Sequence, residues 1–193
     1  MLVPYALTSL ANVKALLGIT DTSQDSLLEL LINAVTDAIE KTCGRRFKKP
    51  ASAVTLLLTG TGSKNLFTND YPIDTITSIK ERKSFNSFEL IDATKYYADV
   101  NAGIIYVDFE TIKAPLGYEV IYKAGYDPIP NDLDMAAAQM VVREYNQRAG
   151  GGDVQSESLG EYSVTYVPVG GAGASEVDMF IDNTVSKYKR PFI

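Results

Sequence analysis

The spacing of apolar residues changes twice along this chain of 193 residues, and the change limits the folds open to it. Apolar residues recur at helical spacing in residues 1–48 and 127–193, whereas residues 49–126 are rich in β-branched and aromatic residues that often alternate with polar ones. A helical period does not suit a strand, so the two kinds of segment form different parts of the fold. The sequence predicts an α+β protein. We expect a small bundle of about four helices, with an antiparallel β-rich segment at 49–126 inserted between the second and third helices.

Four stretches have the spacing of amphipathic helices. The first begins after Thr8 or Ser9 and ends at Gly18, the third begins near residue 131, and the fourth begins near Ser175 and ends before Pro191. The second follows the polar residues 21–26 and is the strongest of the four. Its apolar residues at helical spacing, which we expect to be buried, are Leu27, Leu28, Leu31, Ala34, Val35, Ala38, Ile39 and Cys43.

The stretch KTCGRRF, residues 41–47, contains the only cysteine of the chain. Cys43 lies on the apolar stripe of the second helix, and Gly44 has the position of a glycine that ends a helix. Arg45 and Arg46 lie near the helix C-terminus, where positive charge is favoured, and Phe47 can supply the apolar contact of such a cap. A reactive thiol usually has a helix N-terminus or a histidine beside it, and this one has neither. The pattern therefore favours a structural helix end over a reactive cysteine.

The residue types present limit the chemistry of the chain. It contains no histidine, which removes the usual Ser-His-Asp and Cys-His catalytic arrangements and the His-based metal sites. GTGSK at 60–64 lacks the spacing of a phosphate-binding loop and predicts a tight hairpin turn, and the acids at 131–134 fit helix capping better than a metal loop. We expect no cofactor or metal. A pair of carboxylates that meets only in the fold remains open.

The charge and the apolar runs of the chain limit its partners. It has 18 basic and 24 acidic residues and a net charge of −6, whereas DNA-binding domains are usually basic. Twelve tyrosines in alternating stretches are more typical of sheet faces than of base-stacking platforms. No apolar run reaches the roughly 20 residues that cross a membrane, and the N-terminus lacks a signal-peptide pattern. We expect synthesis in the cytoplasm, no membrane contact and no specific DNA binding.

The end of the chain allows two interpretations. The glycine-rich residues 170–174 precede the fourth helix, and the apolar tripeptide PFI, residues 191–193, follows it. A flexible tether of this composition would let the helix dock on another protein. The same apolar stripe could equally pack on the helix's own bundle, and the residues alone do not separate the two.

Several segments, taken in order, are similar to one family. They are LTSLANVKALLGI, DSLLELLINAVTDAIEKTCGRRF, YKAGYDPIPNDLDMAAAQMVVREYNQR, SESLGEYSVTY and the final YKRPFI. Together they resemble the head–tail connector, or adaptor, proteins of long-tailed double-stranded DNA bacteriophages. The resemblance covers roughly residues 7–47 and 118–193. The β-rich middle resembles only the longer members of the family.

This resemblance implies a structural protein of the virion neck that is not an enzyme and is made in the cytoplasm of a bacterial host. Such proteins form a ring, typically twelvefold, under the portal protein, extend the DNA channel and join the capsid to a stopper or tail. DNA only passes through, and an acidic channel wall would keep it from sticking.

The family's C-terminal segment commonly reaches into the portal, which favours the interpretation that the fourth helix docks on a partner. In a ring, Arg45 and Arg46, which follow the second helix, could contact acids of the next subunit. The resemblance implies portal contacts for the following residues: Phe180, Tyr188, Arg190, Phe192 and Ile193.

Three other functions stay open at this point. The chain could be another neck component, such as a stopper or tail-completion protein. It could be an enzyme that uses carboxylates or tyrosine, which would require a deep pocket with converging acids. It could also be a packaging factor, which would bind DNA in a salt-sensitive way.

Overall fold

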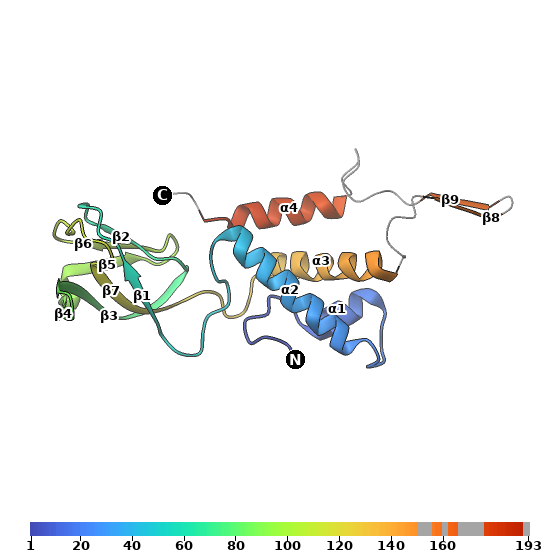
Figure 1. The fold of residues 1–193 in the computed structure, drawn as a ribbon, viewed down its shortest axis with the longest axis horizontal. Helices are drawn as coiled ribbons and strands as arrows, with labels where there is room; N and C mark the ends of the chain where they lie inside the picture. Colours follow the sequence, from blue (N-terminus) through green and yellow to red (C-terminus); the bar gives the residue numbers. More distant parts are fainter. Residues whose placement is uncertain (150–155, 160–161, 166–175, 191–193) are drawn as a thin grey trace. The chain divides into compact units, whose positions relative to one another are not determined.

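The computed structural model describes residues 1–149, 156–159, 162–165 and 176–190 (Figure 1). The chain forms two compact units. We call Met1–Cys43 with Pro130–Ile193 the helical unit and Gly44–Ile129 the β unit. Four helices, antiparallel sheets and strands between the second and third helices confirm the predicted α+β class. The division into a helical core at 1–48 and 127–193 and an insertion at 49–126 stays a prediction about separate domains.

The helical unit contains the helices α1 (Leu10–Leu17), α2 (Asp25–Cys43), α3 (Asn131–Ala149) and α4 (Glu176–Tyr188). Ser9 caps α1 by accepting a hydrogen bond from the Asn12 amide. Gly18, with φ of 68°, and Gly44, with φ of 68°, adopt the left-handed conformation after α1 and α2, as their positions predict. Between α3 and α4 the strands β8 (Ser156–Leu159) and β9 (Tyr162–Thr165) form an antiparallel pair.

The buried face of α2 differs from the predicted stripe. Ala34 and Ala38 are exposed, whereas Ile32 and Thr36 are fully buried. Helix α2 contacts α1, α3 and α4. The N-terminal segment also lies against α2, because the Thr36 hydroxyl accepts a hydrogen bond from the Leu7 amide. These contacts rotate the buried arc, so part of the apolar stripe of α2 faces solvent.

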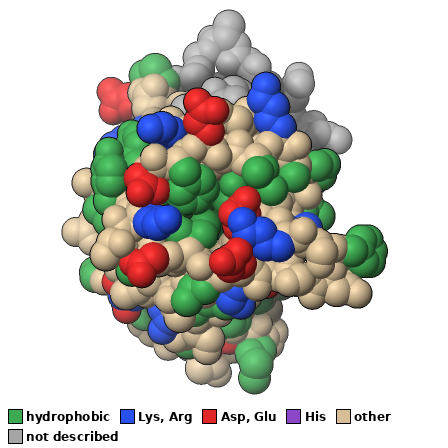
Figure 2. Space-filling view, turned by 90° about the vertical axis from the view of Figure 1, so that its left-hand side faces the viewer, with side chains coloured by type: hydrophobic (Ala, Val, Ile, Leu, Met, Phe, Trp, Pro, Cys, Tyr) green, Lys and Arg blue, Asp and Glu red, His purple; other side chains and the backbone are tan. Residues whose placement is uncertain are grey.

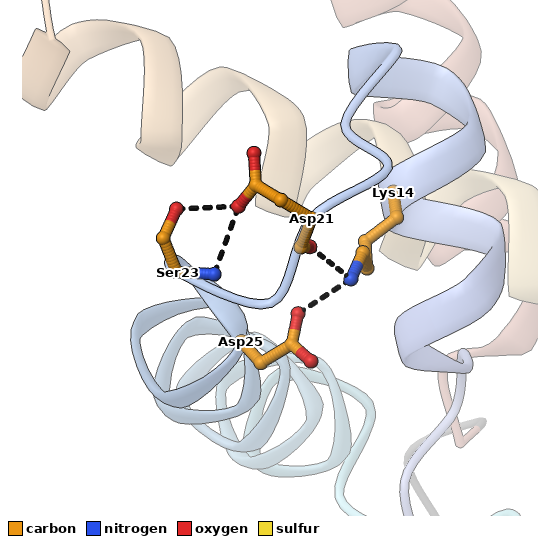
Figure 3. A network of polar contacts seen from close by, with 4 residues as sticks. All are labelled: Lys14, Asp21, Ser23 and Asp25. Carbon is orange, nitrogen blue, oxygen red and sulfur yellow. Dashed lines mark hydrogen bonds and ion pairs between the residues drawn. The ribbon is translucent and has the colours of Figure 1, made fainter.

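A polar network fixes the loop between α1 and α2 (Figure 3). The Lys14 ammonium donates to the Asp21 carbonyl and pairs with Asp25 at 2.7 Å. The Asp21 carboxylate accepts from the hydroxyl and the amide of Ser23, and these hydrogen bonds lower the pKa of Asp21. The loop is therefore held by charge-assisted hydrogen bonds at the start of α2.

Helix α4 packs on the helical unit of its own chain. Ile181, Thr184 and Tyr188 are buried, and α4 contacts both α3 and α2. The Arg143 guanidinium of α3 pairs with Asp178 at 2.6 Å. The resemblance to connector proteins favours docking of this helix on a partner, but the structure shows the other interpretation, in which its apolar stripe faces its own bundle.

The β unit contains two antiparallel sheets. One has the order β1-β7-β3-β4, with β1 Val54–Leu58, β7 Tyr118–Ala124, β3 Ile73–Ser84 and β4 Ser87–Leu90. The other has the order β2-β6-β5, with β2 Asn65–Phe67, β6 Ile104–Val107 and β5 Tyr96–Asp99, and a 3-10 turn at Ala93–Lys95 precedes β5. Both sheets contribute to one apolar core, in which Tyr118, Val120 and Tyr122 share the buried face of β7 as their alternation predicts.

The GTGSK stretch is a link between sheets, so the prediction of a tight hairpin is wrong. It follows β1 of one sheet and precedes β2 of the other. The Gly62 amide donates to the Thr111 hydroxyl, which itself donates to the Ser63 carbonyl. A Cβ on Gly60 would lie 2.0 Å from the Ile112 carbonyl oxygen. This close packing explains the glycine at position 60, and the Gly62 amide is bonded within the β unit.

Asp132, in the first turn of α3, links α3 to α4. Replacement of Asp132 tests how this link depends on pH. Its carboxylate accepts from the Lys187 ammonium and the Tyr188 hydroxyl, each at 2.7 Å. Partial burial raises the pKa of Asp132, but the hydrogen bonds from Lys187 and Tyr188 outweigh burial and lower the pKa below 3.8. We expect Asp132→Asn to lower the free energy of unfolding by about 1 kcal/mol at neutral pH, since Lys187 is largely exposed.

The pH dependence follows from the direction of this shift. A carboxylate with a lowered folded-state pKa stabilises the fold above its unfolded-state pKa, and the contribution is lost as the pH falls through the folded-state pKa. Denaturant unfolding at pH 7 and below pH 3 should therefore show a difference between wild type and Asp132→Asn that shrinks in acid. Asp182→Asn, at an exposed position of α4, is the control. A difference that stays constant with pH would contradict the assignment.

Candidate interaction surfaces

The described residues offer surfaces for binding. Within the described ranges, no three acidic or cysteine side chains gather where they could hold a metal ion. Among the same residues, no helix combines the length and the apolar character needed to span a bilayer.

The acidic excess of the chain belongs to the helical unit. Residues 1–43 and 130–193 contain 7 basic and 14 acidic residues, a net charge of −7. Residues 44–129 contain 11 basic and 10 acidic residues, a net charge of +1. Figure 2 looks onto the molecule from the left-hand side of Figure 1 and shows charges of both signs side by side, with apolar side chains among them. If an acidic surface faces DNA, the sequence places it on the helical unit.

Arg45 lies inside the β unit. It is 4% exposed, and its guanidinium carbon is 3.3 Å from the ring centroid of Tyr71, 4.9 Å from that of Phe47 and 5.8 Å from that of Tyr126. None of its guanidinium nitrogens has a hydrogen-bond partner among the described residues. Aromatic faces stabilise a guanidinium that has lost its water, so these rings take the place of hydrogen bonds.

Arg46 is placed differently from Arg45. Its side chain is exposed, and its amide donates to the Asp70 carboxylate at 2.7 Å. Cys43, two residues before Arg45, is 2% exposed, which confirms that the cysteine is a buried residue at the helix end. The inter-subunit contact expected of both arginines stays a prediction. In this conformation only the Arg46 side chain is presented at the surface.

The five residues expected to contact a portal do not form one surface. Phe180 is 37% exposed on α4, whereas Tyr188 is 9% exposed and bonded to Asp132. The Arg190 amide donates to the Cys43 carbonyl at 3.1 Å, and Phe192 and Ile193 lie outside the described residues. The portal contact stays a prediction for all five.

Two neighbours of Phe180, which the sequence did not assign to a contact, are also exposed. Val177 is 43% exposed and Met179 is 52% exposed, both at the start of α4. The signal was available in the sequence, because Met179 lies outside the apolar stripe that packs the helix on its bundle. With Phe180 they form an exposed apolar surface, which we call the α4 surface.

Comparisons with known proteins identify the family. The sequence matches the family described as HCP, head completion protein, over residues 6–169, and the chain belongs to this family. The predicted resemblance to head–tail connector proteins is thereby confirmed. No curated protein sequence matches the chain.

Two solved structures have a similar fold. One is a chain in the neck of an empty GTA particle computed with C6 symmetry, with a TM-score of 0.63, 15% identity, and coverage of 100% of this chain and 94% of that chain. The other is a chain in the virion of a native gene transfer agent particle, with a TM-score of 0.62, 15% identity and the same coverage. At this identity the likeness shows the fold, and it extends over both units of the chain.

The position of Arg45 leads to a prediction about stability. Arg45→Ala removes a buried guanidinium from three rings, and we expect it to lower the free energy of unfolding by about 2–3 kcal/mol. Arg46→Ala, at an exposed position, should change it by about 0.5 kcal/mol or less. Thermal and denaturant unfolding of both variants checks this. Equal effects of the two substitutions would show that the rings around Arg45 do not stabilise it.

Proposed function

We propose that this protein is a structural component of the neck of a phage-like particle, where copies of it form a ring beneath the portal. The ring extends the DNA channel and joins the capsid to a stopper or tail. The observation that carries the proposal is the match to the head completion family over residues 6–169. The full-length likeness to a chain in the neck of a gene transfer agent particle supports the same function.

The number of copies follows the same reasoning. The similar neck was computed with C6 symmetry. A sixfold axis is compatible with rings of six or twelve copies, and the resemblance to connector proteins favours twelve. Each contact in such a ring joins two different surfaces of neighbouring copies and closes on itself.

The charge of the helical unit suits a channel for DNA. Phosphate contacts supply most of the affinity of proteins for DNA, and they require basic side chains. A unit with a net charge of −7 repels the duplex and lets it slide. The proposed role is therefore passage of DNA without specific binding.

The α4 surface is the part of the C-terminal segment that we assign to the portal contact. Val177, Met179 and Phe180 are exposed, while the opposite side of α4 is buried in the helical unit. A partner can bind this surface without displacing α4 from its bundle. Arg190, Phe192 and Ile193 follow α4 in sequence and extend the same proposal.

Point substitutions test this contact better than truncation, because removing residues 175–193 would expose the side chains that α4 buries. We expect the double substitution Met179→Ser with Phe180→Ser to weaken co-assembly with the portal protein about tenfold or more, since exposed apolar anchors dominate protein interfaces. Electron microscopy and sedimentation of mixtures with the portal protein encoded beside this chain measure the effect.

The control is Leu30→Ser, at an apolar position of α2 that is 59% exposed. It should leave co-assembly unchanged. Portal rings that bind wild type and the double variant equally would remove the α4 surface from the contact. No binding of wild type to the portal would instead favour a stopper or tail-completion role.

A further inference from the structure

Two large apolar side chains project from adjacent loops of the β unit. Phe85, in the turn between β3 and β4, is 89% exposed, and Leu116, in the loop before β7, is 47% exposed. One side chain holds both loops: Arg82 donates from Nε to the Leu116 carbonyl at 3.0 Å and from a terminal nitrogen to the Phe85 carbonyl at 2.8 Å. Its guanidinium also lies over the Phe88 ring at 4.5 Å. We call Phe85 and Leu116 the apolar knob.

The backbone at Leu116 is strained. Its φ of 51° makes it the one residue other than glycine with a positive φ in the described part of the chain. This region is uncommon for residues with a Cβ and persists where surrounding contacts enforce it. Here the Leu116 amide donates to the Thr59 hydroxyl at 3.3 Å, and the Arg82 amide donates to the Gly117 carbonyl at 2.8 Å. The fold thus holds an exposed leucine in a costly conformation, as expected of a preorganised binding residue.

The helical unit contains a groove of complementary character. It lies between α1 and the start of α3 and has a volume of about 470 Å³. Its apolar lining includes Leu16 and Met135, which are 46% and 43% exposed. On its polar side the Asn12 amide donates to both oxygens of Asp134, at 3.2 and 2.9 Å. We call it the α1–α3 groove.

The charges around the knob and the groove have opposite signs. Arg82 and Lys83 lie at the end of β3, next to the turn that contains Phe85, and Lys113 lies in the loop that contains Leu116. Lys83 is paired with Glu81 and Glu89 of its own hairpin. The groove contains Asp134 and belongs to the unit with a net charge of −7. A ring that closes needs two different surfaces of one chain that fit each other. One chain here carries both an apolar projection with Arg82 and Lys113 close by in the sequence and an apolar groove whose one charged lining residue is Asp134.

We propose that the apolar knob of one copy docks in the α1–α3 groove of the next copy and forms the contact that closes the ring. This inference rests on the proposed ring-forming function and assigns the surfaces that form it. Arg82 acts as a positioning residue, because it fixes both loops of the knob through their carbonyl groups.

Cysteine cross-linking tests the contact with both surfaces left intact. Asn86→Cys places a thiol beside Phe85, and Asn131→Cys places one at the edge of the groove; both positions are exposed, while the native Cys43 is buried. Each single variant is assembled on the portal protein, alone and mixed, and treated with a short bismaleimide. We expect cross-linked dimers only in the mixture of the two variants, and a ladder of higher oligomers from the double variant.

In the control mixture, Asn86→Cys is combined with Ala38→Cys, at an exposed position of α2. Suppose that wild type forms rings on the portal by electron microscopy. If the mixed variants then show no cross-links between positions 86 and 131, or cross-link equally to position 38, the proposed contact is overturned and the proposed function still stands. The absence of any wild-type ring on the portal would overturn the proposed function and this contact with it.

A second variant separates binding from folding. Asparagine tolerates a positive φ far better than leucine, so Leu116→Asn relieves the backbone strain while removing the apolar side chain. We expect its melting temperature to equal or exceed that of wild type and its assembly into rings to weaken about tenfold or more. A lower melting temperature with unchanged assembly would show that Leu116 has only a structural role and would overturn its part in the knob.

Discussion

A β unit inserted between two helices must bring its two ends together, and this constraint underlies the structure. The Tyr126 amide donates to the Phe47 carbonyl at 2.6 Å, and the Lys49 amide donates to the Tyr126 carbonyl at 3.0 Å. The rings of Phe47 and Tyr126 also surround the Arg45 guanidinium. Gly125, with φ of 117°, allows this approach, because a Cβ there would lie 2.6 Å from the Phe47 carbonyl oxygen. The closed ends let α2 and α3 belong to one bundle although 86 residues separate the two parts of the helical unit.

Contacts within the helical unit determine which surfaces remain available to partners. Helix α4 is bonded to α3 through Arg143 and Asp132, so its buried side serves folding and only its outer side can serve binding. The acidic excess lies in the helical unit, while the β unit is close to neutral. The proposed function requires surfaces that bind other copies and neighbouring proteins and a surface that lets DNA pass. In this chain the exposed apolar side chains suit binding, and the acidic excess of the helical unit suits the passage of DNA.

Local patterns predicted the parts of the fold that depend on local interactions. Helical spacing located the four helices, and Gly18, Gly44 and Cys43 behave as their positions indicate. Contacts between distant segments could not be predicted. The apolar arc of α2 is wider than any one neighbour covers, so sequence alone could not exclude Ala34 from the core. The rings of Tyr71 and Tyr126 reach Arg45 only through the strand pairing of the β unit, and the exposed side of Phe180 depends on where α4 packs.

The central claim is that this chain is a ring-forming component of a particle neck. The most direct measurement is a cryo-electron microscopy reconstruction of the neck of particles that carry this chain. The account predicts a ring next to the portal whose subunits fit the four-helix unit and the β unit and enclose the DNA path. Density for the chain at another place in the particle, or neck density that neither unit fits, would contradict it.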